Sequence, residues 1–481
     1  MKQQLLLAVI LFLFLNVKGQ NSFEYIISTQ NYEFGYSGFE GDDYYYVLGF
    51  IDSSEEILPK AVICKFSDDN DLIKNEITKE DTSSMFFFGT KNISGNLLLV
   101  GAVSDSASSE HLRNLYICEM TTELEIISEK YHYFIPVGYD FFMIFDMVID
   151  HDNHIVLAGN LENYEGTTDY CFLIVKLDMD GNLLNHNYIE SIHFDGRYRA
   201  DLLAKQDGSG YYYFNGGSYE WVEFNNDLEF VGGDYKLEWG HSLGDPVTVK
   251  YLPDGNLAFV SQSDYGTSYY NMHMQIFTDE FQCILDTVFV EEGRQCPAIL
   301  KGMDFIDPEN IWVVAFNDWI APTGTEIYKI YIFDSDLNVK GSKYYGGDTR
   351  YDFYHLLATQ DGGCLLTGNI KQEQGTMLRD IFIKKVMPDD ILTGTDEKVF
   401  TEFKDVLVYP NPFSNKIFLK TDRGELSFVL YNANGRIVYQ ADIDANVNNE
   451  INTIRLQAGY YIYSITNSNG KAINGGKILK K

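Results

Sequence analysis

The stretch Asp361–Gly368, D-G-G-C-L-L-T-G, decides the fold of this chain because its pattern occurs seven times. Each copy combines a turn, an apolar run and a final small residue, which predicts a short β-strand after a tight turn. The copies end 46 to 58 residues apart, at Gly49, Gly101, Gly159, Asn215, Ser261, Ala315 and Gly368.

A second marker falls between these copies and consists of an apolar strand, an acidic or amide turn, and another strand. Its anchors lie 47 to 57 residues apart, at Phe66, Met120, Leu177, Phe224, Phe277, Phe333 and Met387. Repeats of about fifty residues with several short strands are typical of β-propellers with four strands per blade. We therefore expect an all-β chain with a seven-bladed β-propeller. The first marker would be strand two of each blade, and the second would be the hairpin joining strands three and four.

The end of the repeat region predicts how the propeller closes. Only Ile391–Thr393 follow the last marker before the polar run Gly394–Lys398, so the last blade lacks a good outer strand. The apolar run Phe23–Ile27 has no blade of its own, and pairing it there would remove two exposed strand edges. We expect the propeller over residues 20–390 and a linker over residues 391–403.

The N-terminal segment, residues 1–19, has the pattern of a signal peptide. Lys2 precedes the apolar run Leu5–Leu15, and small or short residues lead to an expected cleavage after Gly19. That run is about eleven residues long, whereas a membrane span needs about twenty. We expect the chain to leave the cytoplasm, with no transmembrane segment after the signal peptide is removed.

The last segment, residues 404–481, predicts a small immunoglobulin-like β-sandwich. Its strands alternate in Val429–Tyr439 and Tyr460–Ile465, and Asn434-Gly435 is a two-residue hairpin signal. Four landmarks occur in order: Tyr409-Pro410-Asn411-Pro412, Asn434-Gly435, Gly459-Tyr460 and the basic tail Lys477–Lys481.

In these landmarks the segment resembles the type A C-terminal sorting domain of the type IX secretion system of Bacteroidetes. The resemblance implies that the secretion machinery is a partner and that the chain passes through the periplasm to the outer surface or the medium. The sorting signal it implies comprises Tyr409, Pro410, Asn411, Pro412, Gly459, Lys477, Lys480 and Lys481. The stretches Tyr344–Gly368 and Lys176–Leu183 also resemble a propeller repeat of exported Bacteroidetes proteins, which implies an architecture but no reaction.

Charge differs sharply between the two parts of the chain. The whole chain carries a net charge of −34, whereas residues 404–481 hold 10 basic and 6 acidic residues. The body from Gln20 to Phe403 is therefore strongly acidic, which disfavours binding to nucleic acid.

All six cysteines lie in the acidic body, and none forms C-x-x-C, so a zinc or redox pair has no support. We expect Cys64, Cys118 and Cys171 to be buried thiols because each lies in an apolar run. Cys283 and Cys296 are the closest pair, and export permits a disulfide between them.

No catalytic motif is present, since the chain lacks H-E-x-x-H, G-x-S-x-G and the phosphate-binding G-x-x-x-x-G-K-[ST]. The run Asp178–Asn182 resembles the start of a calcium loop, but residue 187 is Asn where the loop needs Glu. We expect this run to form a turn, and we expect no metal and no cofactor.

The segments that enter the innermost strands ring one mouth of a propeller channel. Two of them echo each other, Asp195–Arg199 and Asp348–Asp352. Arginine beside tyrosine can bind carboxylates or stack on sugar rings. The candidate ligand-binding residues are Arg197, Tyr198, Arg294, Arg350 and Tyr351. The alternative is that aspartate and arginine here connect neighbouring blades by hydrogen bonds.

Two functions remain open. The propeller is either a non-catalytic platform for a glycan or protein ligand, or an extracellular glycan hydrolase that uses acidic residues at one channel mouth. A hydrolase would confine its unusual acidic residues to one mouth, whereas here they occur throughout the body. The sequence therefore favours a binding platform.

Overall fold

The computed structural model divides the chain into two compact units, Met1–Asp396 and Glu397–Lys481. It describes residues 22–392 and 406–480, apart from gaps at 29–30, 53–58, 68–71, 78–81, 105–111, 137, 164–169, 191–199, 216–219, 235–243, 264–270, 290–295, 299, 317–326, 347–348, 372–378, 410–412, 414, 422–425, 433–434, 445–447 and 468–471. Within these residues, no helix has the length and hydropathy needed to cross a bilayer.

The described part of the first unit contains seven antiparallel sheets, which we number in chain order. Sheets 1 to 3 consist of β2 (Tyr32–Glu40), β3 (Tyr45–Asp52), β4 (Lys60–Phe66), β5 (Leu72–Ile77), β6 (Ser84–Lys91), β7 (Leu97–Ser104), β8 (Leu112–Met120), β9 (Ile126–His132), β10 (Tyr139–Ile149), β11 (Ile155–Asn163), β12 (Tyr170–Leu177) and β13 (Leu183–Glu190). Sheets 4 and 5 consist of β14 (Ala200–Ala204), β15 (Gly210–Asn215), β16 (Glu220–Asn225), β17 (Phe230–Asp234), β18 (Gly244–Tyr251), β19 (Leu257–Ser263), β20 (Asn271–Phe277) and β21 (Cys283–Phe289).

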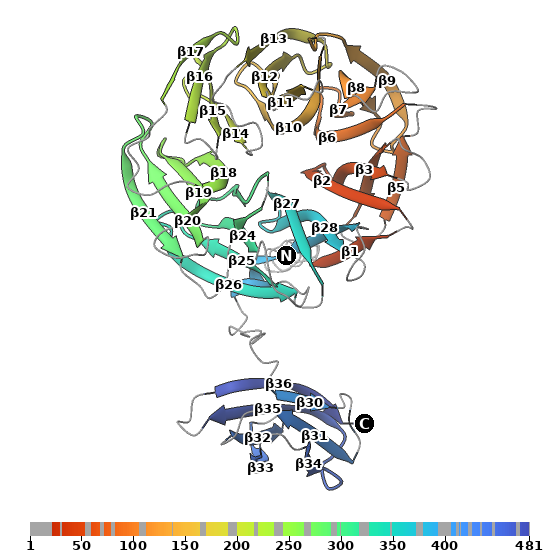
Figure 1. Ribbon diagram of the computed structural model, residues 1–481, viewed down its shortest axis with the longest axis vertical. Helices are drawn as coiled ribbons and strands as arrows, with labels where there is room; N and C mark the ends of the chain where they lie inside the picture. The colour runs from red at the N-terminus through yellow and green to blue at the C-terminus, as the bar shows by residue number, and fades with distance from the viewer. Residues whose placement is uncertain are drawn as a thin grey trace, which may run out of the picture. The chain divides into compact units, whose positions relative to one another are not determined.

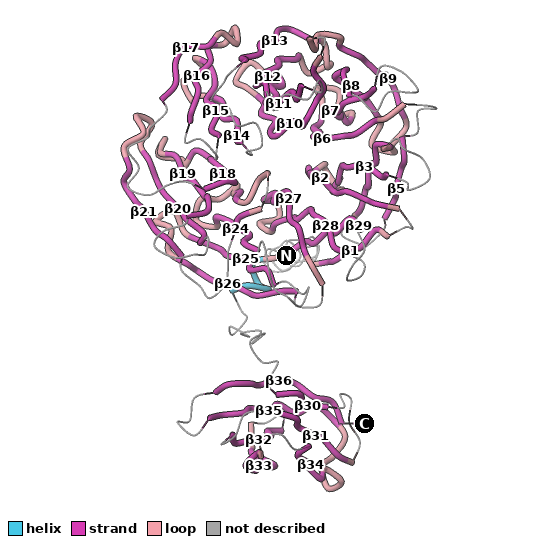
Figure 2. The backbone as a smooth tube through the Cα atoms, in the orientation of Figure 1, coloured by secondary structure: helices cyan, strands magenta, loops and turns pink. Residues whose placement is uncertain are grey.

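Sheets 6 and 7 complete this unit. Their strands are β22 (Cys296–Pro297), β23 (Met303–Asp304), β24 (Ile311–Phe316), β25 (Ile327–Phe333), β26 (Val339–Gly346), β27 (Tyr351–Ala358), β28 (Cys364–Lys371), β29 (Arg379–Val386) and β1 (Phe23–Ile27). The sheets follow one another around a common centre, and β2, β6, β10, β14, β18 and β27 are the innermost strands of their sheets (Figure 1). This arrangement is a β-propeller. Figure 2 shows how little of it is helical, since α2 (Pro388–Leu392), beside β26, is the one helix in the described residues.

The last sheet is completed by β1, a strand from the N-terminal part of the chain. Strand β1 pairs antiparallel with β29, with Phe23 opposite Lys385 and Ile27 opposite Ile381. Phe23 and Ile27 are buried in an apolar cluster with Tyr45 of sheet 1. The prediction that Phe23–Ile27 supplies the missing outer strand is confirmed.

The small residue of the first marker lies where the neighbouring strand leaves no room for a side chain. In sheets 1, 2, 3 and 7 it lies on the second strand, opposite a bulge in the innermost strand. A Cβ at Gly49 would lie 1.8 Å from the carbonyl oxygen of Phe34, and one at Gly368 would lie 2.4 Å from that of Asp352. Because a bulge pushes the backbone towards its partner strand, only a residue without a side chain fits there.

The second marker ends in a turn whose fourth residue takes a left-handed conformation. Leucine or phenylalanine occupies this position in four sheets, with φ of 66° at Leu124, 59° at Leu228, 59° at Phe281 and 58° at Leu337. Leu228 is fully buried against Val156 and Phe172 of the preceding sheet. Left-handed backbone is costly for such residues, so the apolar contact between sheets compensates for local strain.

The second unit packs two sheets around one apolar cluster. One sheet is β30 (Val406–Tyr409), β31 (Lys416–Thr421) and β34 (Asn448–Asn452), and the other is β33 (Ile437–Ile443), β32 (Leu426–Asn432), β35 (Gly459–Asn467) and β36 (Ala472–Lys480). Ile417 and Ile451 of the first sheet share a buried cluster with Phe428, Leu430 and Ile465 of the second.

Cysteine placement follows the sequence prediction for three residues. Cys64, Cys118, Cys171 and Cys364 are buried thiols, whereas Cys283 is an exposed thiol. No disulfide joins these five described cysteines.

Candidate functional site at the propeller centre

One register position on the innermost strands carries polar residues around most of the ring. Each residue there faces the position just before the small marker residue: Ser37 pairs with Leu48, Asp146 with Ala158, Asp201 with Phe214, Thr248 with Val260 and His355 with Thr367. Lys301 joins the set through a parallel bridge to His355. We call Ser37, Asp146, Asp201, Thr248, Lys301 and His355 the axial ring.

The axial ring ties each innermost strand to the next. The backbone N–H of Leu202 donates to Asp146 Oδ2 over 3.0 Å, and that of Val249 donates to Asp201 Oδ2. The N–H of Gly302 donates to Thr248 Oγ1 over 2.9 Å. These side chains therefore satisfy buried amides of the neighbouring sheet, which main-chain pairing within one sheet cannot reach.

Asp304 accepts the same kind of hydrogen bond from the last sheet. The N–H of Ala358 donates to Asp304 Oδ2 over 2.8 Å, and Lys250 Nζ lies 2.5 Å from Asp304 Oδ1. Ser37 Oγ, in turn, donates to the carbonyl oxygen of Phe87 in sheet 2.

The ring also brings opposite charges together. Burial and the charge of nearby Asp146 raise the pKa of the Asp201 carboxyl well above its usual range. Burial alone would lower the pKa of Lys301, but Asp146, Asp201 and Asp304 more than offset this and raise it. Asp201 therefore keeps its proton to a higher pH than an exposed aspartate does, and Lys301 keeps its charge.

His355 is the neutral member of the cluster. Burial, together with the charge of Lys301, lowers the pKa of His355 to about 4. Its Nδ1 has no hydrogen-bond partner within the described residues, and its ring lies 6.4 Å from that of Phe88. The imidazole is therefore uncharged at neutral pH.

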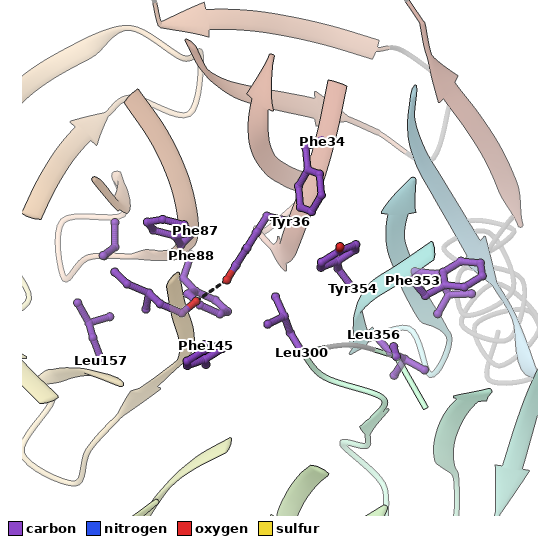
Figure 3. Packing of buried hydrophobic residues seen from close by; sticks show 14 of the residues in the cluster. Phe34, Tyr36, Phe87, Phe88, Phe145, Leu157, Leu300, Phe353, Tyr354 and Leu356 are labelled. Carbon is purple, nitrogen blue, oxygen red and sulfur yellow. Dashed lines mark hydrogen bonds between the residues drawn. The ribbon is translucent and has the colours of Figure 1, made fainter. Parts of the chain in front are cut away.

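Apolar side chains from several sheets converge near the centre (Figure 3). Tyr36, Phe87, Phe145, Leu300 and Tyr354 converge from five sheets, and each is buried. The Tyr36 hydroxyl donates to the carbonyl oxygen of Ile144 over 2.6 Å, which connects sheet 1 to sheet 3. The axial carboxylates are buried as well, with Asp146 4% and Asp201 2% exposed.

The predicted ligand-binding residues are only partly described. Arg197, Tyr198 and Arg294 lie outside the described residues. Arg350 Nε donates to Asp352 Oδ1 over 3.2 Å, and Arg379 Nη1 lies 3.2 Å from Asp352 Oδ2. Two guanidinium groups thus contact one buried carboxylate.

Tyr351 does not take the position that a ligand-stacking residue needs. Its side chain is 6% exposed. Its ring centroid lies 5.0 Å from that of Tyr328 and 5.2 Å from that of Phe382. Tyr351 is therefore core, because alternation along β27 directs it into the sheet packing. The aromatic residue near the arginines is Tyr32, whose ring centroid lies 5.8 Å from Arg379 Cζ.

The calcium-like run forms a turn, as predicted. Asp178 Oδ1 accepts hydrogen bonds from the backbone N–H of Asp180 over 3.0 Å and of Asn182 over 2.8 Å. Asp334 makes the same contacts with Asp336 and Asn338. The carboxylate therefore closes the hairpin turn by accepting backbone hydrogen bonds.

The predicted sorting residues are described in part. Lys480 Nζ donates to the carbonyl oxygen of Thr453 over 2.9 Å, so this lysine is an internal contact of the second unit. Gly459 opens β35 with a φ of 144°, which few other residues adopt. Tyr409 ends β30, and Lys477 lies in β36 opposite Ile462. Pro410, Asn411, Pro412 and Lys481 lie outside the described residues.

Sequence reasoning missed the axial ring. Its only local signal is an aspartate inside an otherwise apolar run, as at Asp146 in F-M-I-F-D-M-V-I. Such a residue is recognisable once the repeat register is known, because Asp146 and Asp201 then fall at the same position.

The fold and its C-terminal unit define a class of exported protein. Residues 407–481 match the family described as a secretion system C-terminal sorting domain. The chain is therefore an exported β-propeller protein with a type IX secretion sorting domain, which passes through the periplasm to the cell surface or the medium.

Comparison with known proteins adds distant likenesses. A protein of unknown function from Bacteroides caccae is 10% identical, with a TM-score of 0.38 over 58% of this chain and 88% of its own. PorZ, a surface component of the type IX secretion system of Porphyromonas gingivalis, is 9% identical, with a TM-score of 0.27 over 93% of this chain and 81% of its own. The propeller domain of the Trilobed protease from Pyrococcus furiosus is 9% identical, with a TM-score of 0.41 over 77% and 98%. Comparison with curated protein sequences gives no match.

Proposed function

We propose that the mature chain is a non-catalytic binding protein built on a seven-bladed propeller. In this proposal residues 1–19 are the signal peptide, 20–390 the propeller, 391–403 the linker and 404–481 an immunoglobulin-like sorting domain. The closure of the last sheet by β1 supports seven blades, because it leaves no sheet in the described part of this unit without its outer strand.

The hydrogen bonds of the central carboxylates support a binding role for the propeller. Asp146, Asp201 and Asp304 each accept a backbone hydrogen bond from the next sheet. A glycoside hydrolase needs two carboxyl groups that face the substrate across a fixed gap. Carboxyls committed to joining sheets are unavailable for that chemistry, which favours binding over hydrolysis.

The ligand subsite we propose is the cluster of Arg350, Asp352, Arg379 and Tyr32. Asp352 is 8% exposed and orients both guanidinium groups, which remain 28% and 23% exposed. Guanidinium groups bind carboxylates through paired hydrogen bonds, and the ring of Tyr32 adds an apolar face. The ligand class that fits is an acidic glycan or a peptide carboxylate.

Binding of uronic-acid oligosaccharides to the mature chain, measured by calorimetry together with a reducing-end assay, tests this proposal. We expect binding without release of reducing ends. Arg350→Ala should weaken binding by about tenfold or more, the loss of one charge-assisted pair. Arg113→Ala is the matched control, since Arg113 Nε lies 3.3 Å from Asp140 Oδ1 in another sheet, with the same 28% exposure as Arg350.

Release of reducing ends by the purified wild-type chain would contradict the proposal and favour the hydrolase. Equal losses for Arg350→Ala and Arg113→Ala would show that the cluster is not the binding subsite.

A further inference from the structure

The outer face of the four-stranded sheet in the sorting domain is apolar at one end. The inner face carries Phe428, Leu430 and Ile465, which are buried. Strand alternation therefore places Tyr431 and Ile462 on the opposite, outward face, where they are directly paired. Ile437 is paired with Tyr431 on the neighbouring strand and completes the row.

Three residues of this row are strongly exposed, and Tyr431 between them is half-buried. Ile437 is 57% exposed and Ile462 is 55% exposed. Tyr460, two residues before Ile462 on the same face of β35, is 56% exposed. Single exposed apolar residues are common, but neighbours on three adjoining strands form a continuous apolar surface. We call Ile437, Tyr431, Ile462 and Tyr460 the apolar row.

The other end of the same face is polar. Its outward positions on these strands are polar at Ser427, Gln440, Asp442, Ser464 and Thr466, and Val429, which the register places between them, is buried. The face is therefore divided, and its apolar end is a local feature of this sheet.

Basic residues flank the apolar row. Arg436 directly precedes Ile437 and is exposed, and Lys477 lies opposite Ile462 in the register of β36. The one acidic residue among the described outward positions of this face, Asp442, lies at the far, polar end. Arg436 thus places a positive charge beside the row, in keeping with the 10 basic and 6 acidic residues of 404–481.

We propose that the apolar row is the surface by which the sorting domain docks onto a protein of the secretion machinery. The matching partner surface is apolar at its centre and acidic at its border, as charge complementarity requires. This inference rests on export through the sorting domain and adds the face that is recognised. The row differs from the predicted sorting residues, of which Lys480 is an internal contact.

Export of full-length variants from the native host tests this surface. Ile462→Glu and Ile437→Glu place a carboxylate in the row without removing buried contacts, so the fold should persist. We expect both variants to accumulate in the periplasm, with export reduced about tenfold or more, as for the loss of a central interface residue. Gln440→Glu is the control, because it adds the same charge to an exposed position on the same strand as Ile437.

Further variants separate folding from docking. Ile462→Thr keeps a β-branched residue in the strand and should reduce export less than Ile462→Glu. Thermal melts of the periplasmic chains should match the wild type; a lower melting temperature in Ile462→Glu with normal export of Ile462→Thr would overturn the proposal. Arg436→Glu should also lower export, since it places a negative charge against an acidic border.

Normal export of Ile462→Glu and Ile437→Glu would overturn the proposal. Deletion of Gly459–Lys481 in the same host then shows which claim has failed: if the deletion blocks export, only the apolar row is wrong. If the deletion is also exported normally, the role of the sorting domain itself is wrong. A wild-type dimer that Ile462→Glu dissociates without affecting export would make the row a contact between copies and would equally overturn the proposal.

Discussion

Asp201→Asn should stabilise the propeller at neutral pH, even though Asp201 is a buried acidic residue at its centre. Burial and the adjacent Asp146 raise the pKa of Asp201 in the folded chain, so the folded chain keeps this proton to a higher pH than the unfolded chain. The same carboxyl ionises in the unfolded chain at its ordinary pKa of about 3.9. Asparagine needs no proton, and its amide can donate to Asp146 while its oxygen accepts from Val249 N–H.

The sign of the pH dependence follows from proton linkage. Between the unfolded and the folded pKa, the folded wild type binds more protons than the unfolded chain, so its stability falls as pH rises. The slope is about 1.4 kcal/mol per pH unit within that window. The Asp201→Asn substitution removes the slope, while imperfect hydrogen bonding of the amide costs about 1 kcal/mol. The variant should therefore be less stable than the wild type near pH 4 and more stable at pH 7.

Asp146→Asn is the matched control. Asp146 accepts backbone hydrogen bonds from Met147 over 2.8 Å and from Leu202 over 3.0 Å, through different oxygens. An asparagine has one oxygen, so one of these N–H groups would face an NH₂ group at a cost of about 1–3 kcal/mol. Urea unfolding of the mature chain from pH 4 to 8, followed by tryptophan fluorescence, reports both variants. If Asp201→Asn destabilises as much as Asp146→Asn, with a difference from wild type that does not vary with pH, then Asp201 does not hold a proton.

Three further outcomes are expected. A chain ending at Leu392 should fold into the propeller alone, with circular dichroism and a melting transition matching those of the propeller in the full chain; failure to fold would move the domain boundary. Deleting Gly459–Lys481 in the native host should trap the protein in the periplasm, and fractionation that finds it in the medium in normal amounts would refute the sorting assignment. Leu228→Ala should cost about 2–4 kcal/mol of unfolding free energy for the lost buried side chain. Leu228→Gly should lower the free energy of unfolding no more than Leu228→Ala does, although glycine usually destabilises a fold. The backbone at position 228 has a φ of 59°, which strains any residue with a Cβ. A larger loss for glycine in denaturant titrations would contradict this account.

The repeat could be read from the sequence because each marker encodes a local steric need. Gly49 and Gly368 lie against bulged carbonyls, so only a small residue is tolerated, and its spacing remains visible in the chain. The closing strand was also predictable from local signals. Phe23–Ile27 is an apolar run that belongs to no repeat, and the last repeat lacks an outer strand with which this run can pair.

The centre was not predictable in the same way. Asp201 and Lys301 are 100 residues apart, and neither has a local sequence signal that assigns it a partner. Their proximity depends on how the innermost strands converge, which only the three-dimensional register reveals. The prediction that Tyr351 contacts a ligand rested on a local signal, the similarity of Asp195–Arg199 to Asp348–Asp352. Strand alternation, however, buries the ring of Tyr351. The sequence left two interpretations of that segment open, ligand binding and hydrogen bonding between blades. Both are compatible with the contacts of Asp352, because a carboxylate that holds Arg350 and Arg379 in place can also orient them towards a ligand.

The pairing of β1 with β29 affects how the propeller resists a force that is applied at its C-terminal end. Any pull on the sorting domain reaches the propeller through α2 and then β29. Strand β29 is an inner strand of its sheet, bonded to β28 on one side and to β1 on the other. Tearing it out along its length would require both ladders to shear together, whereas an edge strand would peel away from a single neighbour. Strand β1, near the N-terminus, thus adds a second ladder that protects the propeller from unravelling when force acts on its C-terminal end.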